Sequence, residues 1–333
     1  MESTRVFQFA PKSPPVRIPD VTEGLQTLKK GGFIWADFSN PNSEDVMPLA
    51  ESLGIHPLAI EDCFDEKAIS KIETYPGHVF ALFNFVTYND QELFTNEVGF
   101  FIGNNFLLTV HGAKHRNSQL FEAFLGAVER PKSEASRGLD FLFHVILDYI
   151  VDRKIDAIEK LHEDIETAEE RVIKQDQTFS PEDLLYMRSC LLSLRKTLFH
   201  EREILIKICR KDYPFVTEKA IYYYRDIYDH LTKFLESVEI NREMISNLLE
   251  LYISMQSNRM AVVSNQTNEI MKRLTLITTI FMPMTLLSGV GGMSEWSMIM
   301  GPENWRYSYP MFFLVMGVLG LFNYGFFKWK KWI

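Results

Sequence analysis

The sequence has few cysteines and no excess of positive charge. Its three cysteines, Cys63, Cys190 and Cys209, are far apart, so they form neither a disulfide framework nor a zinc-binding pattern and indicate reduced thiols in a cytosolic compartment. The formal net charge of −9 argues against nucleic acid as a partner, because nucleic-acid-binding proteins usually have a basic surface. The phosphate-binding motif G-x-x-x-x-G-K-[ST] is absent, so nothing in the sequence supports pumping driven by ATP.

Charged residues are absent from two long stretches near the C-terminal end. Residues 274–293 and 309–327 contain no Asp, Glu, Lys, Arg or His. Each stretch is close to the ~20 residues that a helix needs to cross a bilayer, so we expect two membrane spans in contact with lipid. A buried hairpin of a soluble core is the alternative. Because neither span has an ionisable side chain, the sequence offers no proton relay inside the bilayer.

The charges beside these spans predict the orientation of the chain. Lys272 and Arg273 precede the first span and a basic tail, residues 328–333, follows the second, whereas the loop 294–308 has one arginine and two acids. Segments rich in Lys and Arg stay on the cytoplasmic side. We therefore expect a multi-pass protein of the inner (cytoplasmic) membrane with both termini in the cytoplasm.

The remaining chain shows two patterns. Short β-type runs alternate with turns up to residue 115, which predicts an α+β domain with a short helix from Ser43 and strands at 6–9, 33–38, 69–73, 79–88, 97–102 and 106–110. Helical periodicity follows, with long amphipathic segments at 141–172 and 181–210. The predicted divisions are a cytoplasmic α/β domain (1–115), cytoplasmic antiparallel helices (116–214), a stalk helix (215–273), the first span (274–293), an outer loop (294–308), the second span (309–327) and a tail (328–333).

Proline and glycine are absent from residues 215–282. An unbroken helix of that length would extend about 100 Å and continue into the first span. A single helix cannot bury its apolar side alone, so this segment indicates bundling with further copies of the chain.

One side of this helix has small, neutral-polar and thioether side chains. Steps of three or four residues select Asn268, Met271, Thr275, Thr278, Met282, Thr285 and Gly289. Repeated around a symmetric ring, this stripe would line a narrow, uncharged pore. Ordinary helix packing is the alternative, because small residues are also favoured where membrane helices touch.

Three segments resemble the CorA metal-ion transporter family. They are HPLAIEDC at 56–63, YRDIYDH at 224–230, and NEIMKRLTLITTIFMPMTLLSGVGGM followed by a second span and KWKKWI. The resemblance covers roughly residues 30 to 333. It implies a funnel-shaped homopentameric membrane channel, in which the first span of each chain lines the pore and the second span surrounds it.

The resemblance also implies which residues line the pore. Carried over by position, they are Asn268, Met271, Leu274, Met282, Thr285 and Gly289. We take Leu274 in place of Thr275 as a hydrophobic constriction and keep Thr278 from the periodicity. The expected selectivity filter is Gly292, Met293 and Ser294, where the family has Gly-Met-Asn, and Gly291 stands where the family usually has an aromatic residue.

Acidic residues at two places are expected to bind cations. The resemblance implies that Glu61, Asp62 and Asp226 bind regulatory metal between neighbouring cytoplasmic domains and so hold the channel closed. Carboxylates that face one another repel until a hard divalent cation neutralises them. In the outer loop, Glu295 and Glu303 would concentrate cations at the pore mouth.

These features predict influx of a divalent metal cation, Mg²⁺ or Co²⁺/Ni²⁺, gated by the same ions in the cytoplasm and without an organic cofactor. Serine in place of the family's asparagine puts magnesium selectivity in question, so a zinc transporter is an alternative, with proton coupling through His56, His162 or Asp226 as an option. A non-conducting membrane scaffold is a second alternative. An enzyme is not expected, because the run His162, Glu163, Asp164 matches no metalloenzyme signature.

Overall fold

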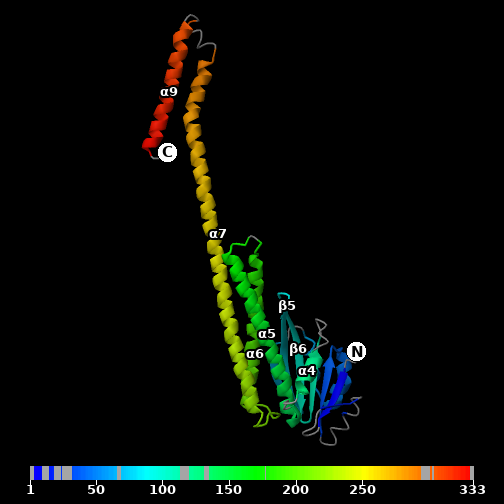
Figure 1. Ribbon diagram of the computed structural model, residues 1–333. Helices are drawn as coiled ribbons and strands as arrows, with labels where there is room; N and C mark the ends of the chain where they lie inside the picture. Colours follow the sequence, from blue (N-terminus) through cyan, green and yellow to red (C-terminus); the bar gives the residue numbers. More distant parts are fainter. Residues whose placement is uncertain are drawn as a thin grey trace. The chain divides into compact units, whose positions relative to one another are not determined.

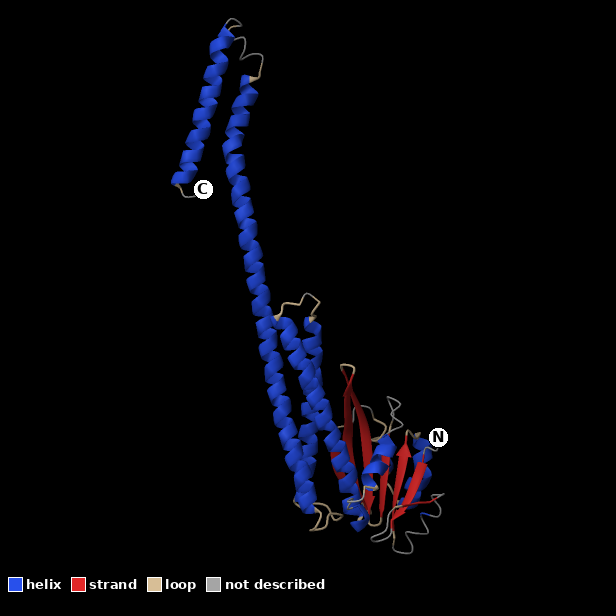
Figure 2. Ribbon diagram, viewed as in Figure 1, coloured by secondary structure: helices blue, strands red, loops and turns tan. Residues whose placement is uncertain are grey.

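The computed structural model describes residues 4–9, 15–18, 24, 32–65, 69–112, 120–130, 135–176, 178–293, 301 and 304–330. The chain forms two units, residues 1–250 and 251–333, and each is described by itself. All described strands belong to the N-terminal unit, and the described part of the C-terminal unit is largely helical (Figure 2).

A seven-stranded sheet forms the centre of the N-terminal unit. Its strand order is β2-β1-β3-β7-β6-β5-β4, with β3 and β7 parallel and all other neighbours antiparallel. The strands are β1 (Thr4–Phe9), β2 (Val16–Ile18), β3 (Phe33–Ser39), β4 (Lys71–Tyr75), β5 (His78–Asn89), β6 (Glu92–Gly103) and β7 (Phe106–His111).

Each of the six predicted strands overlaps an observed one, and two differences have a local cause. Strand β6 begins at Glu92 rather than at residue 97, because the turn from β5 is tight: Asp90 and Gln91 both have positive φ, 51° and 63°. Such turns usually contain glycine, and its absence here conceals the hairpin in the sequence. Strand β2 was missed because three residues are too few to show a period.

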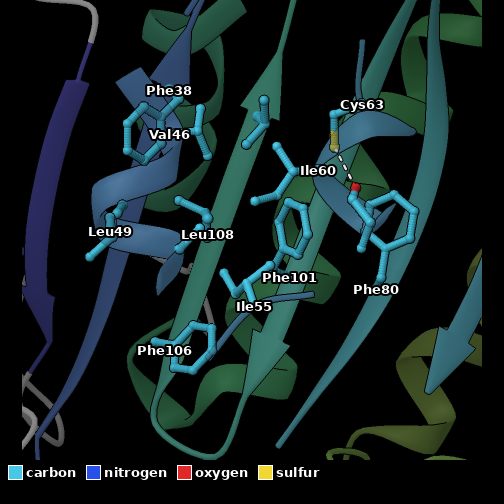
Figure 3. Packing of buried hydrophobic residues seen from close by; sticks show 14 of the residues in the cluster. Phe38, Val46, Leu49, Ile55, Ile60, Cys63, Phe80, Phe101, Phe106 and Leu108 are labelled. Carbon is cyan, nitrogen blue, oxygen red and sulfur yellow. Dashed lines mark hydrogen bonds between the residues drawn. The ribbon is translucent and has the colours of Figure 1, made fainter. Parts of the chain in front are cut away.

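Helices α2 (Ser43–Leu53) and α3 (Pro57–Glu61) cover one face of the sheet. Their buried side chains form a single hydrophobic cluster with Phe80, Phe101 and Leu108 of the strands (Figure 3). Because successive side chains of a strand point to opposite faces, the neighbouring residues Phe83 and Phe100 belong to the other side of the sheet.

The second face of the sheet is covered by helices α4 (Leu120–Val128) and α5 (Leu139–Ile173), with the short helix η1 (Ala135–Arg137) between them. Phe143 of α5 packs against Phe100, with ring centroids 4.9 Å apart, and Phe124 of α4 lies 6.0 Å from Tyr149. The N-terminal unit is therefore a sheet between two helical layers (Figure 1).

Helix α6 (Pro181–Cys209) and the first part of helix α7 (Ile221–Gly291) pack beside α5 in this unit. Within residues 221–250 the buried side chains of α7 recur at alternating steps of three and four, from Tyr224 to Leu248, which is the pattern of a helix packed in a bundle. The Tyr224 hydroxyl donates to the Asp140 carbonyl at 2.6 Å, and Asn241 Oδ1 accepts from His162 Nδ1 at 2.8 Å. Both contacts join α7 to α5, in parallel order.

The C-terminal unit contains residues 251–291 of α7 and helix α9 (Trp305–Trp329), which lie side by side (Figure 1). A Cβ atom on Gly320 would come within 2.6 Å of the Met284 side chain, and one on Gly291 within 2.8 Å of the Phe312 ring. The order of these contacts makes the helix pair antiparallel. Both helices are long and apolar enough to cross a membrane, with mean hydropathies of 1.6 and 1.7 over their most apolar windows.

A fully buried ion pair joins two helices to the sheet. Lys154 of α5 lies 3.0 Å from Glu201 of α6, and both side chains are 0% exposed. The Asn84 backbone N–H donates to Glu201 at 3.0 Å. This N–H is available because β4, which pairs Lys71 with Leu82, does not extend far enough to accept it. Burial lowers the pKa of Lys154, and the Glu201 carboxylate opposes that shift.

We predict that Lys154→Met lowers the stability of the folded protein by about 3–5 kcal/mol, because it leaves a buried carboxylate without its counter-charge. The double variant Lys154→Met with Glu201→Gln should lose less, since glutamine is neutral and still accepts from Asn84. Thermal unfolding of the purified variants measures both. Equal losses in the single and double variants would contradict the role of the charge.

Candidate functional site

The predicted pore stripe lies on one side of α7 in the C-terminal unit. Within residues 274–291 of α7, the half-buried residues face α9, and they are Leu276, Ile280, Pro283, Met284, Leu287 and Gly291. Thr278, Met282, Thr285 and Gly289 are each two residues away from members of this set. Two residues correspond to a rotation of about 200°, so the stripe faces away from α9.

All seven predicted pore residues are exposed in the single chain. The exposed fractions are 54% for Met271, 57% for Leu274 and 67% for Met282. Thr275, the alternative to Leu274, is exposed as well. With both residues exposed, the monomer brings the whole stripe to a surface that other copies of the chain can share.

The threonine hydroxyls of the stripe have a defined orientation. Thr278 donates its hydrogen to the Leu274 carbonyl and Thr285 donates to the Phe281 carbonyl, each at 2.9 Å. Because their hydrogens are used within the helix, both hydroxyl oxygens present lone pairs outward. A row of neutral acceptor oxygens is suited to the water molecules around a hydrated cation.

A depression of about 630 Å³ follows this side of the helix. Its lining includes Thr278, Met282, Thr285 and Gly289 together with neighbouring apolar side chains. A Cβ added to Gly289 would meet no atom within 4 Å, so the missing side chain leaves open space at this level.

Helix α7 ends beside the predicted filter. Gly292 N–H donates to the Ser288 carbonyl at 3.0 Å, and Met293 N–H donates to the Val290 carbonyl at 3.2 Å. At Gly291 the space beside the backbone is taken by the Phe312 ring of α9, so an aromatic group is present there although the sequence has glycine. Ser294, Glu295 and Glu303 lie outside the described residues.

In the N-terminal unit, Glu61 and Asp62 lie at the end of α3. The helix begins at His56, whose Nδ1 accepts from the Leu58 N–H at 3.3 Å, and Pro57 follows in the first turn. Its buried anchor is Cys63, which donates to the Ala59 carbonyl at 3.5 Å (Figure 3). The Cys63 sulfur also occupies the space left by Gly99. Burial raises the pKa of this thiol, so it serves packing.

The two carboxylates at this helix end differ in their surroundings. Glu61 is exposed, whereas Asp62 is half-buried and forms an ion pair with Lys71, with the Lys71 Nζ and Asp62 Oδ2 atoms 2.6 Å apart. Burial alone would lower the pKa of Lys71, but hydrogen bonds and charges from Asp62 and Glu73 outweigh that cost and raise it. Asp62 therefore has a cationic partner in the single chain.

Asp226 is exposed on α7 and belongs to a different group of residues. Asp148 and Asp152 of α5 and His230 of α7 have ligand atoms that all lie within 4.8 Å of one another, a grouping that could hold a metal ion. The charge of Asp226 acts on Asp148, so it lies close to this group. Among the hydrogen bonds and ion pairs of the described chain, none joins Asp226 to Glu61 or Asp62.

Sequence reasoning missed Asp148, Asp152 and His230 as ligands. The signal was the spacing of four residues between Asp148 and Asp152 and again between Asp226 and His230, which places each pair on one side of its helix. Burial, followed by the charge of Asp152, raises the pKa of Asp148 to about 6, while His230 opposes the shift. Burial also raises the pKa of Asp152. Both carboxylates therefore lack full compensation for their negative charge.

The histidines considered for proton coupling have other partners. His56 caps α3 and stacks on Tyr75, with ring centroids 5.1 Å apart. His162 contacts Asn241 at 2.8 Å and Glu166 at 3.5 Å.

Comparison with known proteins identifies a family. The family described as CorA-like Mg²⁺ transporter protein matches residues 30–329. The cobalt/magnesium transport protein CorA of Thermotoga maritima is 32% identical over 312 residues, which cover 90% of this chain and 83% of that protein. The protein of the same description from Methanocaldococcus jannaschii is 24% identical over 262 residues, covering 79% of this chain and 80% of its own.

A solved structure has the same fold. The complete CorA magnesium transporter from Methanocaldococcus jannaschii superposes with a TM-score of 0.70 and 22% identity, covering 100% of this chain and 99% of that one. The α/β domain, the long helices and the two apolar C-terminal helices are thus shared. The family consists of ion transporters and not of enzymes. With a match over residues 30–329, the chain belongs to the family of CorA-like Mg²⁺ transporter proteins.

Proposed function

We propose that this chain is one subunit of a funnel-shaped homopentameric channel that lets divalent cations enter the cytoplasm. The observation that carries the proposal is the exposed, uncharged side of α7 that faces away from α9. In a ring of copies this side would surround the shared axis, and α9 would face lipid. The proposed pore residues are Asn268, Met271, Leu274, Thr278, Met282, Thr285 and Gly289.

The proposed topology follows the charges beside the two apolar helices. The N-terminal unit, the stalk and the basic tail lie in the cytoplasm, spans 274–293 and 309–327 cross the inner membrane, and the loop 294–308 faces outward. A divalent cation moving inward gains roughly 4.6 kcal/mol per 100 mV of inside-negative potential, twice the value for a single charge. Passive influx therefore needs neither ATP nor a proton gradient.

Mg²⁺ and Co²⁺ are the substrates we assign, because the relatives named above are described as transporting cobalt and magnesium. The proposed filter is Gly292, Met293 and Ser294, with Glu295 and Glu303 attracting cations to the mouth. Mg²⁺ loses its water reluctantly, so a filter that contacts the hydration shell suits it. Zinc transport and a non-conducting scaffold are the other outcomes that an uptake experiment separates.

We further propose that cytoplasmic divalent cations close the channel by binding to the N-terminal unit. Glu61, Asp62 and Asp226 are the regulatory ligands implied by family membership. The residues around Asp226 fit such a cation: two carboxylates of raised pKa and one imidazole have their ligand atoms within 4.8 Å of one another. A hard divalent cation would remove the repulsion between Asp148, Asp152 and Asp226.

Uptake of Mg²⁺, Co²⁺, Ni²⁺ and Zn²⁺ into liposomes containing the purified protein tests the activity, and cysteine substitutions test the pore. We expect a charged, water-soluble thiol reagent to reduce Mg²⁺ uptake at least tenfold in Thr285→Cys, because this position would line the axis. The matched control, Leu287→Cys, lies on the side facing α9 and should keep its uptake. Equal inhibition of both variants, or no uptake of any ion by the parent, would contradict the proposal.

Replacing Asp226 with alanine should weaken closure by cytoplasmic metal. We expect the internal Mg²⁺ concentration that halves uptake to rise about tenfold, because one carboxylate ligand is lost. Glu170→Ala removes an exposed acid of α5 and serves as the control. An Asp226→Ala variant with the parental Mg²⁺ dependence would show that regulation lies elsewhere.

The raised pKa of Asp148 predicts a pH effect of defined sign. Because its pKa in the folded protein, about 6, is above the ordinary value of 3.8, the charged form is disfavoured by folding. The contribution of Asp148 to stability should therefore become more favourable as the pH falls from 7.5 to 5.5 in the presence of EDTA. Asp148→Asn should unfold about 2–4 °C higher than the parent at pH 7.5, and this difference should shrink at pH 5.5. Thermal unfolding at both pH values checks this, and identical pH profiles would refute it.

A further inference from the structure

Lys71 is shared by two carboxylates at the end of α3. Its ammonium lies 2.6 Å from Asp62 and 3.2 Å from Glu73, and its side chain is 33% exposed. Asp62 is one of the acids to which the proposed function assigns regulatory metal. Without metal, the Asp62 carboxylate is therefore already paired with a cationic side chain of its own chain, the Lys71 ammonium.

The fold holds these three side chains in place. Lys71 and Glu73 are two residues apart on β4, so they point to the same side of the strand. Pairing of β4 with β5 sets Lys71 opposite Leu82 and Glu73 opposite Phe80, and the ammonium lies 5.9 Å from the Phe80 ring centroid. The third side chain, Asp62, lies at the end of α3, and this end is fixed by the buried anchor Cys63.

Glu73 is itself held in a fixed position. It accepts a hydrogen bond from the Tyr75 hydroxyl at 2.8 Å. The Tyr75 ring stacks on His56, with centroids 5.1 Å apart, and on His78, with centroids 5.2 Å apart. Glu73 is therefore a second acceptor that remains beside the ammonium whether or not Asp62 is available.

We infer that Lys71 is a built-in competitor of the regulatory divalent cation. Without metal, the ammonium neutralises Asp62; when a divalent cation binds at Glu61 and Asp62, the ammonium moves to Glu73 on its own strand. The transfer keeps Lys71 paired in both states and sets the metal concentration at which the site fills. This inference rests on the regulatory role proposed above for Asp62.

The competition predicts that removing the Lys71 ammonium and removing the Glu73 charge shift the inhibitory metal concentration in opposite directions. Removing the ammonium frees Asp62, so a lower metal concentration should suffice. Removing the charge of Glu73 leaves Asp62 as the main acceptor of Lys71, so a higher concentration should be needed. A purely structural ion pair would not produce shifts of opposite sign.

The test measures Co²⁺ uptake into liposomes that contain the full-length protein and a series of buffered internal Mg²⁺ concentrations. We expect the Mg²⁺ concentration for half-inhibition to fall about fivefold in Lys71→Met and to rise about fivefold in Glu73→Gln, the size of an exposed ion pair worth about 1 kcal/mol. Lys71→Arg should keep the parental value. The control Lys174→Met removes a lysine that pairs with Glu170 at 2.8 Å on the surface of α5 and should change nothing.

The variants test the competition by Lys71 separately from the regulatory role of Asp62. The competition would be overturned if Lys71→Met kept the parental Mg²⁺ concentration for half-inhibition, or if this concentration shifted in the same direction in Lys71→Met and Glu73→Gln. Asp62→Asn separates the inference from the proposed function, because an unchanged value in this variant removes Asp62 from regulation altogether. If Lys71→Met does not assemble, Glu73→Gln alone decides, and a fall or no change in its value counts against the inference.

Discussion

Close packing between α7 and α9 determines which side of α7 remains available to other molecules. Two close approaches mark this packing, Gly291 against the Phe312 ring and Gly320 against the Met284 side chain, and a larger residue in place of either glycine would require the neighbouring side chain to move. The apolar side of α7 is used by these contacts. The opposite side carries threonine hydroxyls and thioethers without a charge, and it is this side that gives the proposed pore its chemistry.

The N-terminal unit contains charges of two kinds. Lys154 and Glu201 are buried together and neutralise each other's charge, and Glu201 also accepts from a strand N–H, so this pair links the helices to the sheet. Asp148 and Asp152 are only half-buried and repel each other, with His230 as a partial counter-charge. In the first arrangement, the opposite charges of Lys154 and Glu201 balance within one chain. The second would gain from a divalent cation, and for this reason our proposal includes it in regulation.

Much of the architecture could be predicted from the sequence, because strand alternation, helical periodicity and the absence of charge are local properties. The two apolar helices and six of the seven strands were predicted in this way. The β5–β6 turn was not, since Asp90 and Gln91 adopt positive φ without glycine. The acids that the family resemblance implies as regulatory were named from the sequence. Asp148 and Asp152 were not, because their partner His230 follows far along the chain and meets them only when α7 packs on α5.

The sequence by itself determined that one stripe of α7 is uncharged and small, since a helical period fixes which residues share a side. Only the tertiary structure decided that this stripe faces away from α9, because the direction depends on where Phe312 and Met284 pack. The same holds for Asp62. Its place in the family's motif can be read along the chain, whereas its pairing with Lys71 requires β4 to lie beside the end of α3, a contact set by burial of apolar side chains between helix and sheet.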